Sequence, residues 1–423
     1  MILHDEERRE TLEIDVAAWA VLSCADGTRE VEGIVAAAAR LGAQTRPEAV
    51  TELLQALAER GGLEAGAPAH APDVVTIRKR PAGVLELPVA VLPGYRYVCD
   101  GSGGCCRSYG SVLLTPGDRD RARAALPGHR IAGLPSTRWF TPERGSAPTP
   151  LCVPVSVDGG CGFLDAQGLC EIHRRVGLEG KPRACAAFPV VICSDGVELR
   201  VSVMPECACV LRPVGPGEGE TIGEGWQIGA DVPSVLVVDV LPETIQVDGT
   251  RTAPRSWLRS AVGDLYERSV HAVDPADLCW SEADAWSTPK PRDLAPYVDA
   301  LHRHAKDTMR RRSTYVGTDD WVLRSLRWLV GTLHLLEDPS LQALVVAPTE
   351  MPDPIERRYL QAALWSYQGF DDDTAAFALR LHAVRIWIAR AMSEVPLAPS
   401  EHAVALASLN MLLRGHALAR AWQ

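Results

Sequence analysis

The stretch CDGSGGCC, from Cys99 to Cys106, opens the segment that decides the fold of this chain. Outward from it, ten of the twelve cysteines in the 423-residue sequence lie between Cys99 and Cys209. Thiolates drawn together from several segments bind zinc or iron more readily than they form disulfides when the compartment is reducing. The sequence therefore predicts a metal-binding domain built around these cysteines.

The N-terminus and the net charge narrow the class of protein. The N-terminal residues include Asp5, Glu6 and Glu7 and have neither the basic region nor the apolar region of a secretory signal. We therefore expect a cytoplasmic protein. No uncharged apolar run approaches the ~18 to 20 residues of a membrane span, so no membrane partner is expected. A net charge of -11 argues against a nucleic-acid partner, because phosphate binding needs clustered Lys and Arg.

Hydrophobic periodicity divides the chain into three segments and predicts an α+β protein. Residues 1–66 combine a short hairpin with three helices. Residues 74–250 form a loop-rich cysteine domain with short strands, and residues 254–423 form an all-helical domain. A stretch rich in Pro, Ala and Gly links the first two segments. The length of 423 residues fits two or three domains that each bury a core.

The first segment has the pattern of a winged-helix module. Residues 2–3 and 11–14 can pair as a hairpin, and an apolar helical pattern starts at Val16. Thr28 is a good cap for a second helix. A third helix begins at Pro47 and stops before a pair of glycines, as expected for Pro at a helix start and Gly after its end.

Two strings in this segment, AVLSCADGTREVEGIV and VTELLQALAERGGLE, resemble the small peptide-recognition domain of the pyrroloquinoline quinone pathway. The resemblance implies that a substrate peptide adds as a strand to the edge of the hairpin. The alternative is a winged helix that only packs against the next domain, because fold does not determine function.

The other two segments differ in their patterns. Short apolar runs divided by Gly and Pro predict five strands in the second segment: residues 74–77, 84–91, 111–114, 198–203 and 235–238. Apolar stripes at helical spacing predict core-facing helices in the third segment, with these residues: Val322, Leu326, Leu329 and Leu333; Phe377, Leu381, Val384 and Ile388; Val404, Leu409 and Leu412.

The cysteines lie within a recognisable order of motifs: CDGSGGCC, then CGFLDAQGLCEIH, then KPRACAAFP, then MPECAC. This order resembles a cysteine-cluster family described as a zinc- or iron-chelating domain. The length and the helical tail, with IERRYLQAALW and LRLHAVRIWIARAM, are most similar to its flagellin lysine-N-methylase subgroup. The resemblance implies seven candidate metal ligands: Cys99, Cys105, Cys106, Cys161, Cys170, Cys185 and Cys207.

The sequence departs from the family at two positions. Ser102 stands where the opening motif has its second cysteine, and Lys181 stands where the family often has Arg. The missing thiolate lowers the number of ligands or passes the role to another cysteine. His173 is expected to be a partly exposed helix residue rather than a ligand. Four other thiols are expected to be bystanders: Cys152, Cys193, Cys209 and Cys279.

Seven thiols exceed the need of one metal ion, since zinc takes four ligands and a four-iron cluster takes three or four thiolates. In an extended chain Cys105 and Cys106 point to opposite faces, so both reach one centre only if the preceding glycines bend the backbone. A cluster of several irons accepts ligands from more directions than one zinc ion does. We therefore expect an iron–sulfur cluster, with zinc as the alternative cofactor.

Two functions remain open. The resemblance implies an enzyme that modifies a side chain of a peptide or protein partner, with methyl transfer from S-adenosylmethionine to lysine as the reaction. The residues themselves do not identify the methyl donor, and no three cysteines have the C-x3-C-x2-C spacing typical of a radical S-adenosylmethionine enzyme. The alternative is a non-catalytic zinc or iron site that organises a binding or metal-handling protein.

Overall fold

A computed structural model of the chain describes these residues: 2–5, 10–13, 16–22, 25, 30–40, 43–59, 87–101, 103–108, 112, 114–142, 152–154, 156–157, 160–177, 180–222, 238–312, 321–370, 374–394 and 401–412. The chain divides into two compact units, Met1–Ile77 and Arg78–Gln423. Helices and strands are both present, and the C-terminal part is helical, so the chain is an α+β protein.

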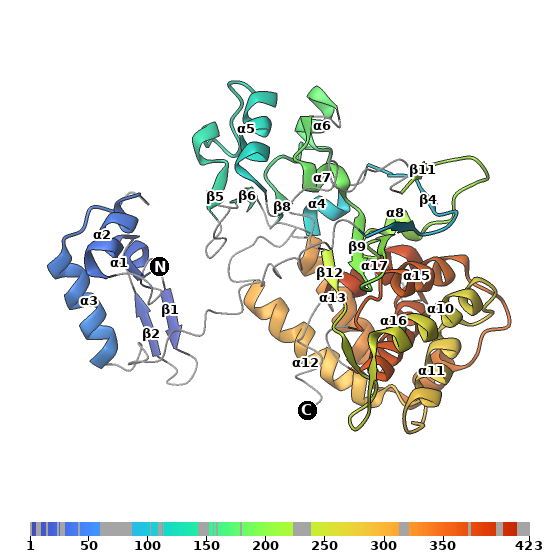
Figure 1. The fold of residues 1–423 in the computed structure, drawn as a ribbon. Helices are drawn as coiled ribbons and strands as arrows, with labels where there is room; N and C mark the ends of the chain where they lie inside the picture. Colours follow the sequence, from blue (N-terminus) through green and yellow to red (C-terminus); the bar gives the residue numbers. More distant parts are fainter. Residues whose placement is uncertain are drawn as a thin grey trace. The chain divides into compact units, whose positions relative to one another are not determined.

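The first unit consists of a hairpin and three helices (Figure 1). Strand β1 (Ile2–Asp5) pairs antiparallel with β2 (Glu10–Glu13). Helices α1 (Val16–Leu22), α2 (Val31–Arg40) and α3 (Pro47–Glu59) follow, and the apolar positions of their sequences meet in a small core. The predicted hairpin and the three predicted helices are thus confirmed. The core side chains are Val21, Ile34, Ala38, Ala43 and Val50.

A four-stranded sheet organises the second unit. Its strand order is β12–β9–β10–β3, in which β9 and β10 are antiparallel and the two outer strands run parallel to their neighbours. Both central strands are almost wholly buried, which fits their β-branched composition. The strands are β3 (Val89–Val91), β9 (Val190–Ser194), β10 (Leu199–Val203) and β12 (Val238–Val240).

Shorter strand pairs and helices surround this sheet in the cysteine-rich segment. The paired strands are β4 (Arg96–Tyr97) with β11 (Glu220–Thr221), β5 (Phe140–Pro142) with β6 (Cys152–Pro154), β7 (Ser156–Val157) with β8 (Gly160–Cys161), and β13 (Thr244–Gln246) with β14 (Thr252–Pro254). The helices are α4 (Gly104–Ser108), α5 (Pro116–Ala125), the 3-10 helix η2 (Ser136–Arg138), α6 (Glu171–Val176), α7 (Arg183–Ala187) and α8 (Ala208–Leu211).

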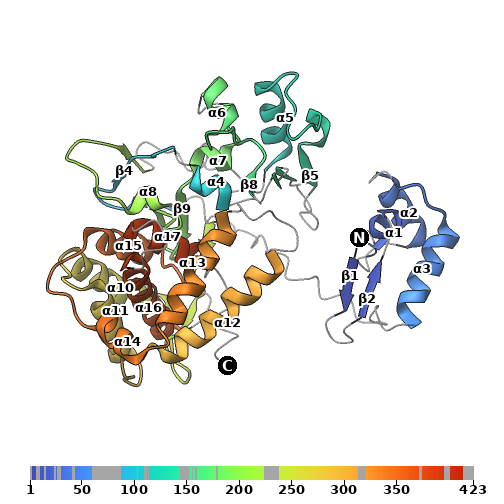
Figure 2. The same ribbon diagram turned by 180° about the vertical axis from the view of Figure 1, so that it is seen from behind.

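The C-terminal helices pack in pairs, with α11 against α16 and α12 against α13 (Figure 2). Asp residues cap several of them, and Pro at the first helical position fixes the start of α11, α14 and α15. The helices are α10 (Arg255–Val270), α11 (Pro275–Trp286), α12 (Ala295–Arg312), α13 (Trp321–Leu335), α14 (Pro339–Val346), α15 (Pro354–Trp365), α16 (Ala375–Glu394) and α17 (His402–Leu412).

One hydrophobic core joins the sheet to these helices. Ile192 and Val201 of the sheet belong to the same buried cluster as Leu329 of α13 and Trp387 of α16. The cysteine-rich segment and the helical segment therefore share a core within the second unit. A smaller cluster around Trp139, Phe163 and Ile172 lies beside the cysteines. Within the described residues, no helix is both long enough and apolar enough to cross a membrane.

The five predicted strands agree with the observed strands to different degrees. The strand predicted at 198–203 is β10, and the end of the one predicted at 84–91 is β3. Residues 74–77 and most of 235–238 lie outside the described residues, as do two of the four residues at 111–114. The sequence analysis missed β9, which supplies a central strand of the sheet.

Candidate metal centres

A first group of thiols forms where a strand end meets a short helix. Cys99 follows β4, and α8 begins after Cys207, so that Cys209 lies in its first turn. The Tyr95 hydroxyl donates a 2.7 Å hydrogen bond to the Val210 carbonyl and anchors the strand to the helix. The fold thereby brings thiols from both ends of the cysteine segment together.

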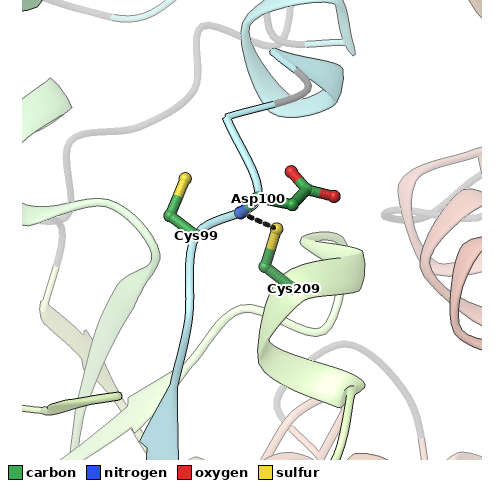
Figure 3. A group of neighbouring side chains, drawn as sticks. All are labelled: Cys99, Asp100 and Cys209. Atoms are coloured by element: carbon green, nitrogen blue, oxygen red, sulfur yellow. Dashed lines mark hydrogen bonds between the residues drawn. The ribbon is translucent and has the colours of Figure 1, made fainter. Parts of the chain in front are cut away.

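Cys99, Asp100 and Cys209 form a compact set of possible ligands (Figure 3). Their two sulfurs and one carboxylate oxygen all lie within 4.8 Å of one another. The backbone N–H of Asp100 donates to Sγ of Cys209 at 3.5 Å. Cys99 and Asp100 are exposed, whereas Cys209 is buried, so the set opens to solvent on one side.

Neighbouring groups shift the acidity of these thiols. Interaction with the Cys207 thiol raises the pKa of Cys209 to about 12, and a hydrogen bond with Cys209, together with burial, raises the pKa of Cys99. Arg212 supplies a positive charge beside them, since its Nη1 lies 2.5 Å from Oδ2 of Asp100 and 4.0 Å from Sγ of Cys209. Without a metal, these thiols stay protonated at neutral pH.

A second group of thiols lies around the loop CGFLDAQGLC. Cys161 ends β8, and Cys170 precedes the first turn of α6. The loop closes on itself because the Asp165 carboxylate accepts hydrogen bonds from two backbone N–H groups at 2.9 Å, and Cys170 pairs with Leu164 as an isolated bridge. This closure brings Cys161 and Cys170 to the base of one loop.

Cys185 completes the second group from helix α7. Burial, followed by the neighbouring Cys161 thiol, raises the pKa of Cys185 to about 12, whereas Lys181 opposes the rise. Cys161, Cys170 and Cys185 all pack against the small core that contains Phe163. Their ligand atoms interact electrostatically but are not all within 4.8 Å of one another.

The backbone after Cys99 joins the two groups. Gly103 has a φ of +68° and touches the loop so closely that an added Cβ would lie 1.9 Å from the Gly168 carbonyl oxygen. Helix α4, which contains Cys105 and Cys106, then packs against β8. The predicted bend at the glycines is present, and it leads into a helical turn instead of the extended chain that the sequence analysis considered.

The structure divides the seven predicted ligands between these groups. Cys99 and Cys207 belong to the first group. Cys161, Cys170 and Cys185 form the second, and helix α4, which contains Cys106, packs against β8, which contains Cys161. The Cys105 side chain lies outside the described part of the structure, as does Ser102. None of the cysteines whose side chains the structure describes is in a disulfide.

Cys209, which the sequence predicts to be a bystander, lies in the first group beside Cys99. The sequence signal for this position is the C-x-C spacing of Cys207 and Cys209, a few residues after the central strand β10. Cys193 and Cys279 are buried on β9 and α11. His173 is exposed on α6, as expected.

A third set of possible ligands lies among the C-terminal helices. Asp353, Glu356 and His402 have ligand atoms within 4.8 Å of one another. The Arg390 guanidinium, however, makes hydrogen bonds of 2.8 and 2.7 Å to the two Glu356 oxygens and one of 2.9 Å to Asp274. Because this cation engages both oxygens of Glu356 and the set contains no thiol, we assign the set to a structural ion-pair network.

Comparison with known proteins identifies no relative. No family model matches the chain, no curated protein matches it, and no solved structure matches it.

Proposed function

We propose that the chain binds an iron–sulfur cluster through Cys161, Cys170 and Cys185, with Cys106 as a fourth ligand. The observation that carries the proposal is the gathering of three thiols around one loop and one small core. Iron–sulfur clusters are bound by thiolates, and this donor set fits them. Each thiolate binds a different iron, so the ligands need to be farther apart than around a single ion, which suits sulfurs that are not all within 4.8 Å.

We also propose that the chain modifies a side chain of a peptide or protein. The hairpin and three helices of the first unit are the elements of a winged-helix module, and their sequence resembles a peptide-recognition domain. A bound peptide would present its side chain to the metal-containing unit, which lowers the entropic cost of bringing the two together. The cysteine motifs suggest lysine N-methylation with S-adenosylmethionine as the donor.

The cluster would supply an iron for binding and polarising a cosubstrate. Residues of the chain itself supply the charge and the apolar surroundings beside Cys161, Cys170 and Cys185. Lys181 brings a positive charge beside the thiolates, and the buried apolar side chains Phe163 and Ile172 exclude water from one side of the group. Arg174 and Arg175 keep Glu171 ion-paired at distances of 2.5 and 2.6 Å, so this carboxylate does not compete for the metal.

Anaerobic purification with analysis of iron, sulfide and zinc tests the proposal. We expect a brown protein with absorption near ~400 nm from thiolate–iron charge transfer. Cys161→Ser and Cys185→Ser should each lose most of the iron, while Cys279→Ser, which changes a buried thiol on α11, should keep it. A colourless wild-type protein without iron would contradict the proposal, as would full iron content in both ligand variants.

One observation favours the alternative, a non-catalytic zinc site that organises a binding protein. The ligand atoms of Cys99, Asp100 and Cys209 lie within 4.8 Å of one another, and this spacing suits a single ion. Stoichiometric zinc without iron, in a protein that leaves all tested peptides unmodified, would support that alternative.

A further inference from the structure

We propose that Cys99, Cys207 and Cys209, with Asp100, form a second metal site, and that this site binds Zn²⁺. The family pattern counts Cys99 and Cys207 with the other thiols and leaves Cys209 out. The geometry separates them, because these thiols come from β4 and α8, whereas the other group comes from β8, α6 and α7. This inference goes beyond the iron–sulfur proposal and does not depend on it.

The spacing of the ligand atoms carries the inference. Zn–S bonds of ~2.3 Å at tetrahedral angles place two sulfurs about 3.8 Å apart. The sulfurs of Cys99 and Cys209 and the oxygen of Asp100 already lie within 4.8 Å of one another. A small contraction therefore suffices to bind one ion, whereas ligands of a multi-iron cluster need more separation.

Cys207 supplies the third thiol. The Cys207 thiol raises the pKa of Cys209, and both are buried under 9% exposure at the start of α8, although the sulfur of Cys207 is not among the ligand atoms that lie within 4.8 Å of one another. One residue separates the two cysteines at the start of α8, so the Cys207 sulfur has to move toward the other three groups when an ion binds. Three thiolates and the Asp100 carboxylate would then make a tetrahedral set for zinc.

Groups outside the ligand set orient it and balance its charge. The Asp100 backbone N–H donates to Sγ of Cys209 at 3.5 Å, a bond that favours a thiolate over a thiol. The Arg212 guanidinium lies 4.0 Å from the same sulfur and 2.5 Å from Oδ2 of Asp100, and it would offset the negative charge that several thiolates and a carboxylate leave on a zinc site. Arg212 also donates to Glu401 at 2.8 Å, which ties the set to the chain just before α17. Such outer contacts are typical of metal ligands.

The test measures zinc and iron separately in the full chain. In protein purified anaerobically, Cys209→Ser should lose about one zinc per chain and keep its iron and sulfide. Cys161→Ser should do the reverse, and Cys279→Ala, a buried thiol elsewhere, should keep both metals. If the proposed iron–sulfur cluster is absent altogether, the zinc result still stands alone.

A second measurement covers the case in which Cys209→Ser fails to fold. Metal-free protein titrated with Co²⁺ should develop cobalt–thiolate absorption, and Asp100→Asn, which retains every thiol, should weaken Co²⁺ binding about tenfold or more. Three results would overturn the proposal: loss of iron rather than zinc from Cys209→Ser, unchanged Co²⁺ affinity in Asp100→Asn, or a Cys99–Cys209 disulfide as the state in anaerobically purified protein.

Discussion

The Tyr367 hydroxyl donates a 3.1 Å hydrogen bond to Oδ2 of Asp195, a carboxylate with no exposed surface. Asp195 lies in the turn between β9 and β10, where its other oxygen accepts from two backbone N–H groups. Tyr367 follows the end of α15. Arg200 stacks beside this pair, 4.8 Å from the Tyr367 ring. The contact fastens the sheet of the cysteine-rich segment to the C-terminal helices.

The backbone conformation at the end of α15 depends on this contact between Tyr367 and Asp195. The N–H of Gln368 bonds to the Ala363 carbonyl, and that of Tyr367 bonds to the Leu364 carbonyl, which together form a Schellman motif. Tyr367 occupies the left-handed position of the motif with a φ of +51°, where glycine is usual. The backbone accepts this conformation because the side chain reaches Asp195 and packs on Arg200.

We expect Tyr367→Phe to lower the free energy of unfolding by about 1.5 to 3 kcal/mol, because a buried carboxylate loses a hydrogen bond. Urea unfolding of the single variants and of the double variant with Asp195→Asn measures the coupling between the two side chains. Additive effects in this cycle would show that the hydrogen bond does not join the two segments.

His382 makes stability depend on pH. Its Nε2 lies 3.0 Å from the Gln368 carbonyl and its Nδ1 lies 2.7 Å from the Tyr359 hydroxyl, so the ring is neutral with the proton on Nε2. Burial lowers the pKa of His382 from 6.5 to about 3. Below pH 6.5 the unfolded chain therefore binds a proton that the folded chain does not. His382 destabilises the fold progressively as the pH falls toward 3.

Between pH 7 and pH 5 this difference amounts to about 2 kcal/mol. His382→Gln should reduce the loss of stability over that interval by this amount, as measured from urea midpoints at each pH. His271→Gln, at an exposed position, should follow the wild-type profile. Identical profiles for wild type and His382→Gln would show that the ring is protonated in the folded state.

The Arg390 guanidinium forms ion pairs with two buried carboxylates, those of Glu356 and Asp274. Burial opposes ionisation of Glu356, yet hydrogen bonds from Arg390 and the nearby His402 ring, whose Nε2 lies 3.2 Å from Oε1, keep its pKa below the usual value. Arg390→Met leaves Glu356 and Asp274 as buried charges without this partner, and we expect a loss of about 3 to 5 kcal/mol in unfolding free energy. Arg303→Met, at an exposed site on α12, should change it little. A loss under 1 kcal/mol in Arg390→Met would mean that water replaces the guanidinium.

The sequence predicts local elements well because their signals are local. The apolar stripe from Val322 to Leu333 is buried on α13, and the helix predicted from Pro47 is α3. It cannot reveal that Asp195 meets Tyr367, since nothing near either residue encodes a contact 172 positions away. The same limit applies to the shared core of sheet and helices.

For the candidate sites, too, the sequence predicts only part of the arrangement. Cysteine spacing selects a set of thiols, but it does not determine which of them meet, because that depends on the pairing of β4 with β11 and the packing of α8. Cys99 and Cys209 are 110 positions apart in the sequence, yet their sulfurs lie within 4.8 Å of each other. The cysteine motifs therefore predicted the segment in which thiols gather, and they could not predict how these thiols divide into groups.

Gly103 tests whether the loop contact is needed for metal binding. In Gly103→Ala the new Cβ would collide with the Gly168 carbonyl and push the loop of Cys161 and Cys170 away from α4. We expect this variant to lose most of the metal bound by the second group, measured by elemental analysis. Gly133→Ala is a matched control, because Gly133 also has a positive φ but no atom within 4 Å of the added Cβ. Equal metal loss in both variants would assign the effect to backbone strain alone.

The first unit tests the proposed recognition of a peptide. Because residues 1–77 form a compact unit, a chain that starts at Arg78 should keep its fold and its metal content while losing affinity for the substrate peptide. The hairpin β1–β2 supplies strand edges to which an extended peptide can add. Fluorescence anisotropy with labelled candidate peptides encoded beside this gene measures binding to the full chain, to the shortened chain and to residues 1–77 alone. Peptide binding by residues 1–77 with wild-type affinity is the expected result. Undiminished binding by the shortened chain would assign recognition to the second unit and leave the hairpin and its helices with a structural role.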